Sequence, residues 1–312
     1  MASLKQIRQR IRSIQSTKQI MRAMQLVSGS KFKRAQTRLL QSRQMMGFLD
    51  QLLRRVLAAT SQPKQGRKKA ALTHPLMATR DGLPDALLVV TSDAGLAGSY
   101  NTNLIQLAEA ELRKDTARAV QLSYLGKRGA RYLTKRGYRA KDSILDMASR
   151  PDIARIDVIG RTLMDRFLAG EIGSVRVLYA KFVSPSVSRP TIAQWLPIQL
   201  ESAESLQSAV RSPQINRPTR QRANPTTLEY LFEPSPERVF ADLLPRWAIA
   251  TFRLLLLEAF TSEHGARMIA MKNATDNAED LLGSLTRQRN KIRQATITRE
   301  LSEIVGTAEA LK

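Results

Sequence analysis

The chain has 312 residues, of which 50 are Lys or Arg and 27 are Asp or Glu, so its formal net charge is +23. It holds no cysteine and only two histidines, His74 and His264, which excludes disulfides and cysteine nucleophiles and favours isolated surface or hydrogen-bonded histidines over a metal site. No run of 18 apolar residues occurs, so we expect no membrane-spanning helix, and no motif calls for a metal or cofactor.

The N-terminal part of the chain is predicted to form one long helix. An apolar stripe recurs at steps of three and four residues, with Lys18 in a gap; its members are Leu4, Ile7, Ile11, Ile14, Met21 and Met24, widened by Ile20 and Val27. The first proline is Pro63, so we expect a helix from about Leu4 to Ala58, roughly 80 Å long. This segment carries 13 Lys or Arg residues against Asp50 alone, which makes it the basic element of the chain.

The middle of the chain has the pattern of a small open-sheet α/β domain, residues 86–200. Short apolar runs predict strands, which we place at Ala86–Thr91, Val120–Leu125, Ser174–Val183 and Thr191–Leu196. Helices are predicted at about Thr102–Lys114, after Gly126, and at about Asp152–Ala169. The last two strands are expected to pair across Pro185–Pro190. Residues 61–85 and 201–234 are rich in proline and basic residues, so we interpret them as a linker and as a basic linker with a foot segment.

A glycine turn after the first predicted strand raises the question of nucleotide binding. Gly95 and Gly98 do not fit G-x-G-x-x-G, and the chain contains no G-x-x-x-x-G-K-[ST]. The second strand ends in Gly126-Lys127-Arg128, with no acidic residue to hold a ribose. A tight strand-to-helix turn is therefore the favoured interpretation.

A second long helix is predicted from Ser235 to the C-terminus, residues 235–312. Ser235 suits the N-cap, Pro236 the first helical position and Glu237 the first turn. We expect a kink or a break near Pro245. Its apolar stripe continues through Val239, Leu243, Trp247, Leu254, Leu257, Met268, Met271, Leu281, Leu285, Ile292, Ile297, Leu301, Ile304 and Val305. The predicted fold class is α/β with long helices, in which helices 1–60 and 235–312 form an antiparallel coiled coil and the α/β (Rossmann-like) domain is inserted between them.

Several segments resemble the γ subunit, the central rotor stalk, of F-type ATP synthases. The resemblance covers nearly the whole chain in order and is most specific in the C-terminal helix. It rests on residues 1–24, Thr91–Gly98 with Asn101, Lys181–Ser184, Tyr230–Pro234, Ser262–His264, Ala266–Met271, Ala274–Ala278, Arg293-Gln294, Ile297-Thr298 and Glu300-Leu301. Ala94 stands where the family usually has arginine.

The resemblance implies a noncatalytic shaft that couples ion-driven rotation of a c-ring to conformational change in catalytic β subunits. Its implied partners are the ring of α and β subunits, the ε subunit and the c-ring, with no direct contact to nucleic acid. It would be peripheral at the cytoplasmic face of the bacterial inner membrane, touching the membrane only through the c-ring. The family match places Arg293, Gln294 and Thr298 at a β-subunit loop and Met24 and Arg267 at the moving β lever. Leu301, Ile304 and Val305 would form an apolar bearing tip, and Tyr230 and Glu233 would approach the c-ring and ε.

Two other functions stay open on the residues alone. A sequence pI of about 11 also suits a basic coiled-coil protein that binds nucleic acid, although its apolar stripe needs burial along the length that would line a groove. The other function that stays open is that of an enzyme that binds a nucleotide in the α/β domain. Neither alternative explains why both termini form one stalk.

Overall fold

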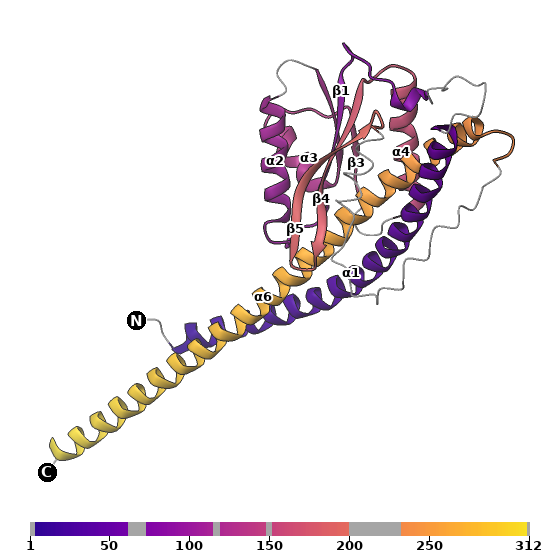
Figure 1. The fold of residues 1–312 in the computed structure, drawn as a ribbon. Coiled ribbons are helices and arrows are strands. Elements are labelled where there is room, and N and C mark those ends of the chain that lie inside the picture. The colour runs from indigo at the N-terminus through magenta and orange to yellow at the C-terminus, as the bar shows by residue number, and fades with distance from the viewer. Residues whose placement is uncertain (1–3, 62–72, 115–118, 148–151, 200–231, 311–312) are drawn as a thin grey trace, which may run out of the picture. The chain divides into compact units, whose positions relative to one another are not determined.

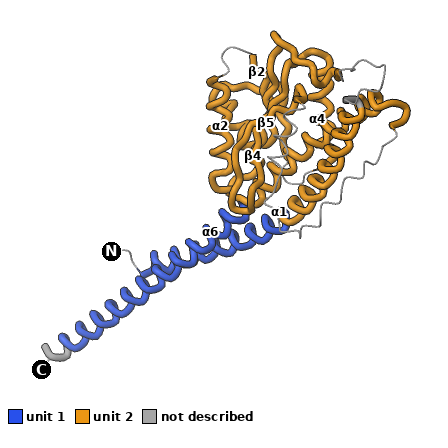
Figure 2. The backbone as a smooth tube through the Cα atoms, in the orientation of Figure 1, with its two compact units in different colours: residues 1–31, 267–312 blue, residues 32–266 orange. Residues whose placement is uncertain are grey.

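A computed structural model describes residues 4–61, 73–114, 119–147, 152–199 and 232–310. The chain divides into two compact units, one made of residues 1–31 and 267–312 and the other of residues 32–266 (Figure 2). This division cuts both long helices instead of following the predicted domain boundaries. Most of the two predicted linkers, residues 62–72 and 200–231, lies outside the described residues.

Two long helices begin and end close to the predicted positions. Helix α1 spans Leu4–Ser61 and helix α6 spans Pro236–Ala310. The hydroxyl of Ser235 accepts a hydrogen bond from the backbone N–H of Arg238 at 3.3 Å, which confirms the predicted N-cap. The break considered near Pro245 is absent, because α6 continues through it. Leu244 and Trp247 are buried on either side of the proline, and this packing offsets a helix penalty of about 3 kcal/mol.

The inserted domain contains a five-stranded sheet with the order β3-β2-β1-β4-β5. The strands are β1 (Asp85–Val90), β2 (Val120–Leu125), β3 (Asp142–Ile144), β4 (Ser174–Ser184) and β5 (Val187–Leu196). Neighbours are parallel except β4 and β5, which form an antiparallel pair. The four predicted strands are confirmed, while β3 was missed because three residues of the sequence Asp-Ser-Ile carry no apolar pattern. Strand β5 also begins earlier than predicted, because an edge strand tolerates Pro190.

Helices cover both faces of this sheet (Figure 1). They are α2 (Tyr100–Lys114), α3 (Lys127–Lys135) and α4 (Ile153–Leu168), preceded by a short 3₁₀ turn, η1 (Pro75–Met77). Strand β1 is buried along its whole length, as expected for a central parallel strand. Its Leu87 and Val89 pack with α2 and α3 in one core, and its Leu88 and Val90 pack with α4, α6 and α1 in the other. The predicted open-sheet domain is therefore present, with α6 serving as part of one covering layer.

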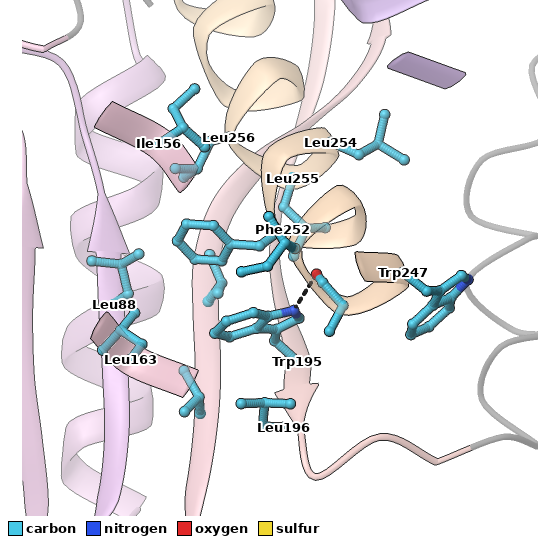
Figure 3. Packing of buried hydrophobic residues seen from close by; sticks show 14 of the residues in the cluster. Leu88, Ile156, Leu163, Trp195, Leu196, Trp247, Phe252, Leu254, Leu255 and Leu256 are labelled. Atoms are coloured by element: carbon cyan, nitrogen blue, oxygen red, sulfur yellow. Dashed lines mark hydrogen bonds between the residues drawn. The ribbon is translucent and has the colours of Figure 1, made fainter. Parts of the chain in front are cut away.

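Aromatic and polar contacts fasten the sheet domain to α6. The rings of Trp195 and Phe252 lie 4.7 Å apart between centroids, and the Trp195 indole donates to the carbonyl oxygen of Ala248 at 2.8 Å (Figure 3). Arg253 makes two hydrogen bonds to the Asp157 carboxylate on α4, at 2.9 and 2.6 Å. Such paired bonds fix the orientation of both side chains. The sheet domain is thus held to α6 at defined positions along the helix.

A buried ion pair joins α1 to α6 inside the unit made of residues 32–266. Arg43 Nη2 lies 2.8 Å from Glu258 Oε1, and the Glu258 side chain is only 2% exposed. Burial raises the pKa of Glu258, while the hydrogen bond and the charge of Arg43 oppose that rise. Burial and then the neighbouring Glu258 raise the pKa of Tyr179 on β4 above its ordinary range. The pair ties α1 to α6 next to the sheet.

The same substitution at two helix glycines tests how closely α4 approaches α6. A Cβ on Gly160 would lie 2.9 Å from Cδ1 of Phe252, whereas a Cβ on Gly47 of α1 would meet nothing within 4 Å. Both substitutions gain the same helix propensity, so the steric clash alone distinguishes them. The free energy of unfolding of Gly160→Ala should therefore be lower than that of Gly47→Ala by about 2 kcal/mol. Urea denaturation of both variants measures the difference. Equal midpoints would contradict the close approach.

Candidate partner-contact surfaces of the helix pair

In the unit made of residues 1–31 and 267–312, α1 and α6 are paired antiparallel. Lys18 Nζ lies 3.1 Å from Glu279 Oε2, and a Cβ on Gly29 would lie 3.4 Å from Sδ of Met268. The residue numbers in each of these pairs add up to 297. A constant sum defines the register of an antiparallel helix pair. The predicted pairing of the two termini is therefore confirmed in this unit.

The same register holds in the other unit, residues 32–266. The Thr251 hydroxyl donates to Sδ of Met46 at 3.7 Å, and the Trp247 indole donates to Oδ1 of Asp50 at 2.6 Å. Both pairs again add up to 297. The two helices are therefore antiparallel within this unit as well.

The seam between the helices is narrower than the sequence predicted. Ile7 and Ile11 are buried as expected, but Ile20 and Val27 are 59% and 57% exposed, so their assignment to the seam was wrong. Ser28 is buried instead. Next to it, Gly29 leaves room for the side chain of Met268 on α6, whereas Ile20 and Val27 lie on the exposed side of the helix. The pattern of apolar residues alone overestimated the buried width.

The register places Leu4, the first described residue of α1, level with Arg293 of α6. Residues 294–310 of α6 therefore have no described α1 residue opposite them. Arg293, Gln294 and Thr298 are all exposed, and the Thr298 hydroxyl donates to the backbone oxygen of Gln294 at 3.0 Å. The side chains of Arg293 and Gln294 are therefore exposed close to the level of Leu4, the first described residue of α1.

An apolar patch follows near the end of α6. Leu301, Ile304 and Val305 stand at positions i, i+3 and i+4, so they share one helix face, and they are 58%, 65% and 61% exposed. Within the described part of the chain nothing covers them. Three large apolar side chains exposed together on one face are typical of a surface that binds a partner.

The other predicted contact residues differ in accessibility. Met24 is half-buried, and Arg267 is buried at 6% exposure within this chain. Glu233 is exposed just before α6 begins, while Tyr230 lies outside the described residues. The structure thus presents Glu233 and the end of α6 directly, and covers most of Arg267.

The turn that raised the question of nucleotide binding is filled by the chain itself. The first three N–H groups of α3 donate to Asp93 Oδ1, to the Ser92 carbonyl and to the Thr91 hydroxyl, at 3.0, 3.0 and 2.9 Å. These are the groups that a phosphate would use at a helix N-terminus. A Cβ on Gly126 would collide with the Thr91 backbone, so glycine here serves the tight turn. The interpretation as a strand-to-helix turn is supported.

Neither histidine belongs to a metal site among the described residues, which hold no group of three or more metal-ligating side chains. His74 Nδ1 accepts a hydrogen bond from the backbone of Leu76 at 3.1 Å, and His264 is buried. None of the helices that the structure describes is both long enough and apolar enough to cross a membrane.

Comparison with known proteins decides the family. A sequence model described as ATP synthase matches residues 3–311. The chain is 38% identical to the ATP synthase gamma chain of Symbiobacterium thermophilum, over 99% of this chain and 98% of that one. The gamma chain of Anaeromyxobacter sp. strain K is 37% identical over the full length of both. The chain belongs to the ATP synthase gamma chain family.

Solved structures agree on the fold of this gamma chain. A chain from the Euglena gracilis mitochondrial ATP synthase matches with a TM-score of 0.60 at 17% identity, covering 99% of this chain and 94% of that one. A chain from the central stalk and c-ring of the Tetrahymena thermophila enzyme gives 0.53 at 21% identity, covering 82% and 99%. As a gamma chain, the protein is a noncatalytic subunit of the central stalk of ATP synthase.

Disulfide trapping tests the register between α1 and α6. The chain has no cysteine of its own, so only the two introduced cysteines can form a disulfide within it. Oxidation of Gly29→Cys/Met268→Cys should crosslink the two helices rapidly, because these positions are in contact. Gly29→Cys/Lys272→Cys should crosslink slowly, because exposed Lys272 lies one turn further along α6. Gel mobility after oxidation reports both yields. Equal crosslinking rates in the two variants, or disulfide-linked dimers of two chains, would contradict the register in which paired residue numbers add up to 297.

The capped N-terminus of α3 predicts that the isolated chain does not bind Mg-ATP tightly. Its first three N–H groups already have acceptors, so a phosphate would have to displace them. Isothermal titration should give no saturable heat. A stoichiometric dissociation constant of about 1 µM, near −8 kcal/mol, would overturn this expectation.

Proposed function

We propose that this chain is the rotor shaft of an F-type ATP synthase. It would turn inside the ring of α and β subunits and couple ion-driven rotation of the c-ring to conformational change in β. The observation that carries this proposal is the antiparallel pairing of α1 and α6 in both units, together with the exposed polar and apolar groups in the last part of α6. A paired shaft is stiffer than one helix, which suits a part that must transmit rotation.

The polar group formed by Arg293, Gln294 and Thr298 is proposed to engage a β-subunit loop. Support comes from the exposure of all three at the level where the described part of α1 ends. A guanidinium offers oriented, charge-assisted hydrogen bonds to carboxylates of a partner. Met24 and Arg267 are proposed to face the moving β lever. Because Arg267 is buried in this chain, its contact would need a local rearrangement of its cover.

The apolar patch of Leu301, Ile304 and Val305 is proposed to run in a hydrophobic sleeve of the α and β ring. Apolar contacts are nondirectional, so a bearing of this kind has no preferred angle. The exposure of all three side chains in the isolated chain supports this role, since the sleeve would supply their missing cover.

At the other end of the helix pair, Glu233 and Tyr230 are proposed to approach the c-ring and the ε subunit. The chain would then be a peripheral protein at the cytoplasmic face of a bacterial inner membrane, attached through the c-ring. Exposed Glu233 beside the start of α6 supports the assignment at this end. Nucleic-acid binding receives no support, because Ile7 and Ile11 of the α1 stripe are buried within the chain itself.

Removing the polar group should weaken coupling without preventing assembly. Arg293→Ala/Gln294→Ala deletes hydrogen bonds worth about 1–3 kcal/mol each when one partner is charged. ATP synthesis and ATPase turnover should fall together, since both depend on β sensing the angle of the shaft. Arg287→Ala/Gln288→Ala removes the same residue types, also exposed, six positions earlier and should retain turnover. Complexes reconstituted with the α and β subunits supply both measurements. Unchanged turnover in the first variant would refute the assignment of the polar group.

A charge in the apolar patch should loosen the bearing. Leu301→Asp/Ile304→Asp places two carboxylates where an apolar sleeve would surround them, which is costly without partners. The yield of reconstituted complex should drop, whereas Ser302→Asp, at an exposed polar neighbour, should assemble normally. Size-exclusion chromatography measures the yield. Full assembly of the double variant would contradict an apolar sleeve.

A further inference from the structure

A dense group of cations surrounds α3, far in sequence from the proposed shaft contacts. Residues 127–141 contain seven Lys or Arg residues and no Asp or Glu. None of them contributes to the interpretation of the chain as a rotor shaft. The segment belongs entirely to the unit made of residues 32–266.

The helix separates its cations from its buried side. Gly129 and Leu133 are buried against the core of the sheet domain. Arg128, Arg131 and Lys135 stand at positions i, i+3 and i+7, which places them together on the opposite, exposed side of the helix. Arg139 is exposed in the segment that follows. We call Arg128, Arg131, Lys135 and Arg139 the cationic face.

The cations around this face differ in how they are neutralised. At its edges, Lys127 lies 2.5 Å from Asp146, Lys141 lies 3.8 Å from Glu171 and Arg136 lies 4.0 Å from Glu109. In the cationic face itself, Arg131, Lys135 and Arg139 are exposed and take part in none of the ion pairs found among the described residues. The result is a positive centre inside a rim that also carries carboxylates.

We propose that the cationic face docks an acidic surface of another subunit of the synthase. This inference rests on the proposed function only for the identity of the complex. The rim favours a protein over a membrane or a nucleic acid, because its cations are already paired with Asp146, Glu171 and Glu109. The positive surface is thereby confined to a small area, which an acidic patch of a protein matches better than an extended polyanion. Three of the four members are arginines, whose guanidinium matches a carboxylate with two parallel hydrogen bonds.

Acetylation of Lys135 tests the proposal in the intact synthase. The side chain is exposed in this chain, so the isolated protein should react rapidly. In the detergent-solubilised synthase, Lys135 should react several-fold more slowly, as measured by mass spectrometry. Equal rates in the chain and in the synthase would overturn the proposal. The ATPase activity of the same sample tests the rotor role separately, because it does not depend on the acetylation result.

Matched charge reversals show whether the arginines of the cationic face are needed to bind the acidic partner. Arg131→Glu/Arg139→Glu should restore rapid acetylation of Lys135 in the synthase, whereas Arg155→Glu/Arg161→Glu, the same change at exposed positions of α4, should leave it protected. If the first variant does not assemble, the wild-type comparison alone decides. Protection that appears only with vesicles of anionic lipid, or that disappears with nuclease, would overturn the protein partner in favour of a membrane or a nucleic acid.

Discussion

The antiparallel register between α1 and α6 is the constraint on which the other features depend. Within each unit, two contacts share the same sum of residue numbers, 297: Asp50–Trp247 and Met46–Thr251 in one, and Gly29–Met268 and Lys18–Glu279 in the other. This register decides which residues of α6 lie opposite α1 and which continue beyond Leu4. Leu301, Ile304 and Val305 lie in the part of α6 that has no described α1 residue opposite it.

Directional contacts hold the sheet domain at a defined position on α6. Apolar packing alone offers little resistance to sliding, because it has no strong directional preference. The paired hydrogen bonds of Arg253 with Asp157 and the bond of Trp195 to Ala248 do have direction. The buried Arg43–Glu258 pair adds a contact whose breakage would leave a charge without a partner in the core, at a cost of about 3–5 kcal/mol. The contacts of Arg253 and Trp195 give the domain a defined angle on α6, and the Arg43–Glu258 pair holds α1 to the same part of α6.

The inserted domain shows how a fold associated with nucleotides serves another purpose. Its parallel strands and glycine turn resemble a dinucleotide-binding unit, yet Thr91, Ser92 and Asp93 occupy the N–H groups at the start of α3. The helix is thereby fixed on the sheet by its own chain, and its outer side is left to arginine and lysine. What α3 offers to a partner is the charge of its side chains and not the N–H groups of its first turn.

Much of the architecture follows from the sequence alone, because local signals govern it. The periodic stripes and the Ser235 cap located both helices within a few residues, and unbroken apolar runs located four strands. What the sequence left undetermined depends on groups distant in the chain. Strand β3 forms only because β2 is beside it, and α6 passes Pro245 only because core residues on both sides are buried. The exposure of Ile20 and Val27, the burial of Arg267 and the pairing of Arg43 with Glu258 were likewise decided by tertiary packing, since hydrophobic periodicity gives the direction of a stripe but not how much of it a partner helix covers.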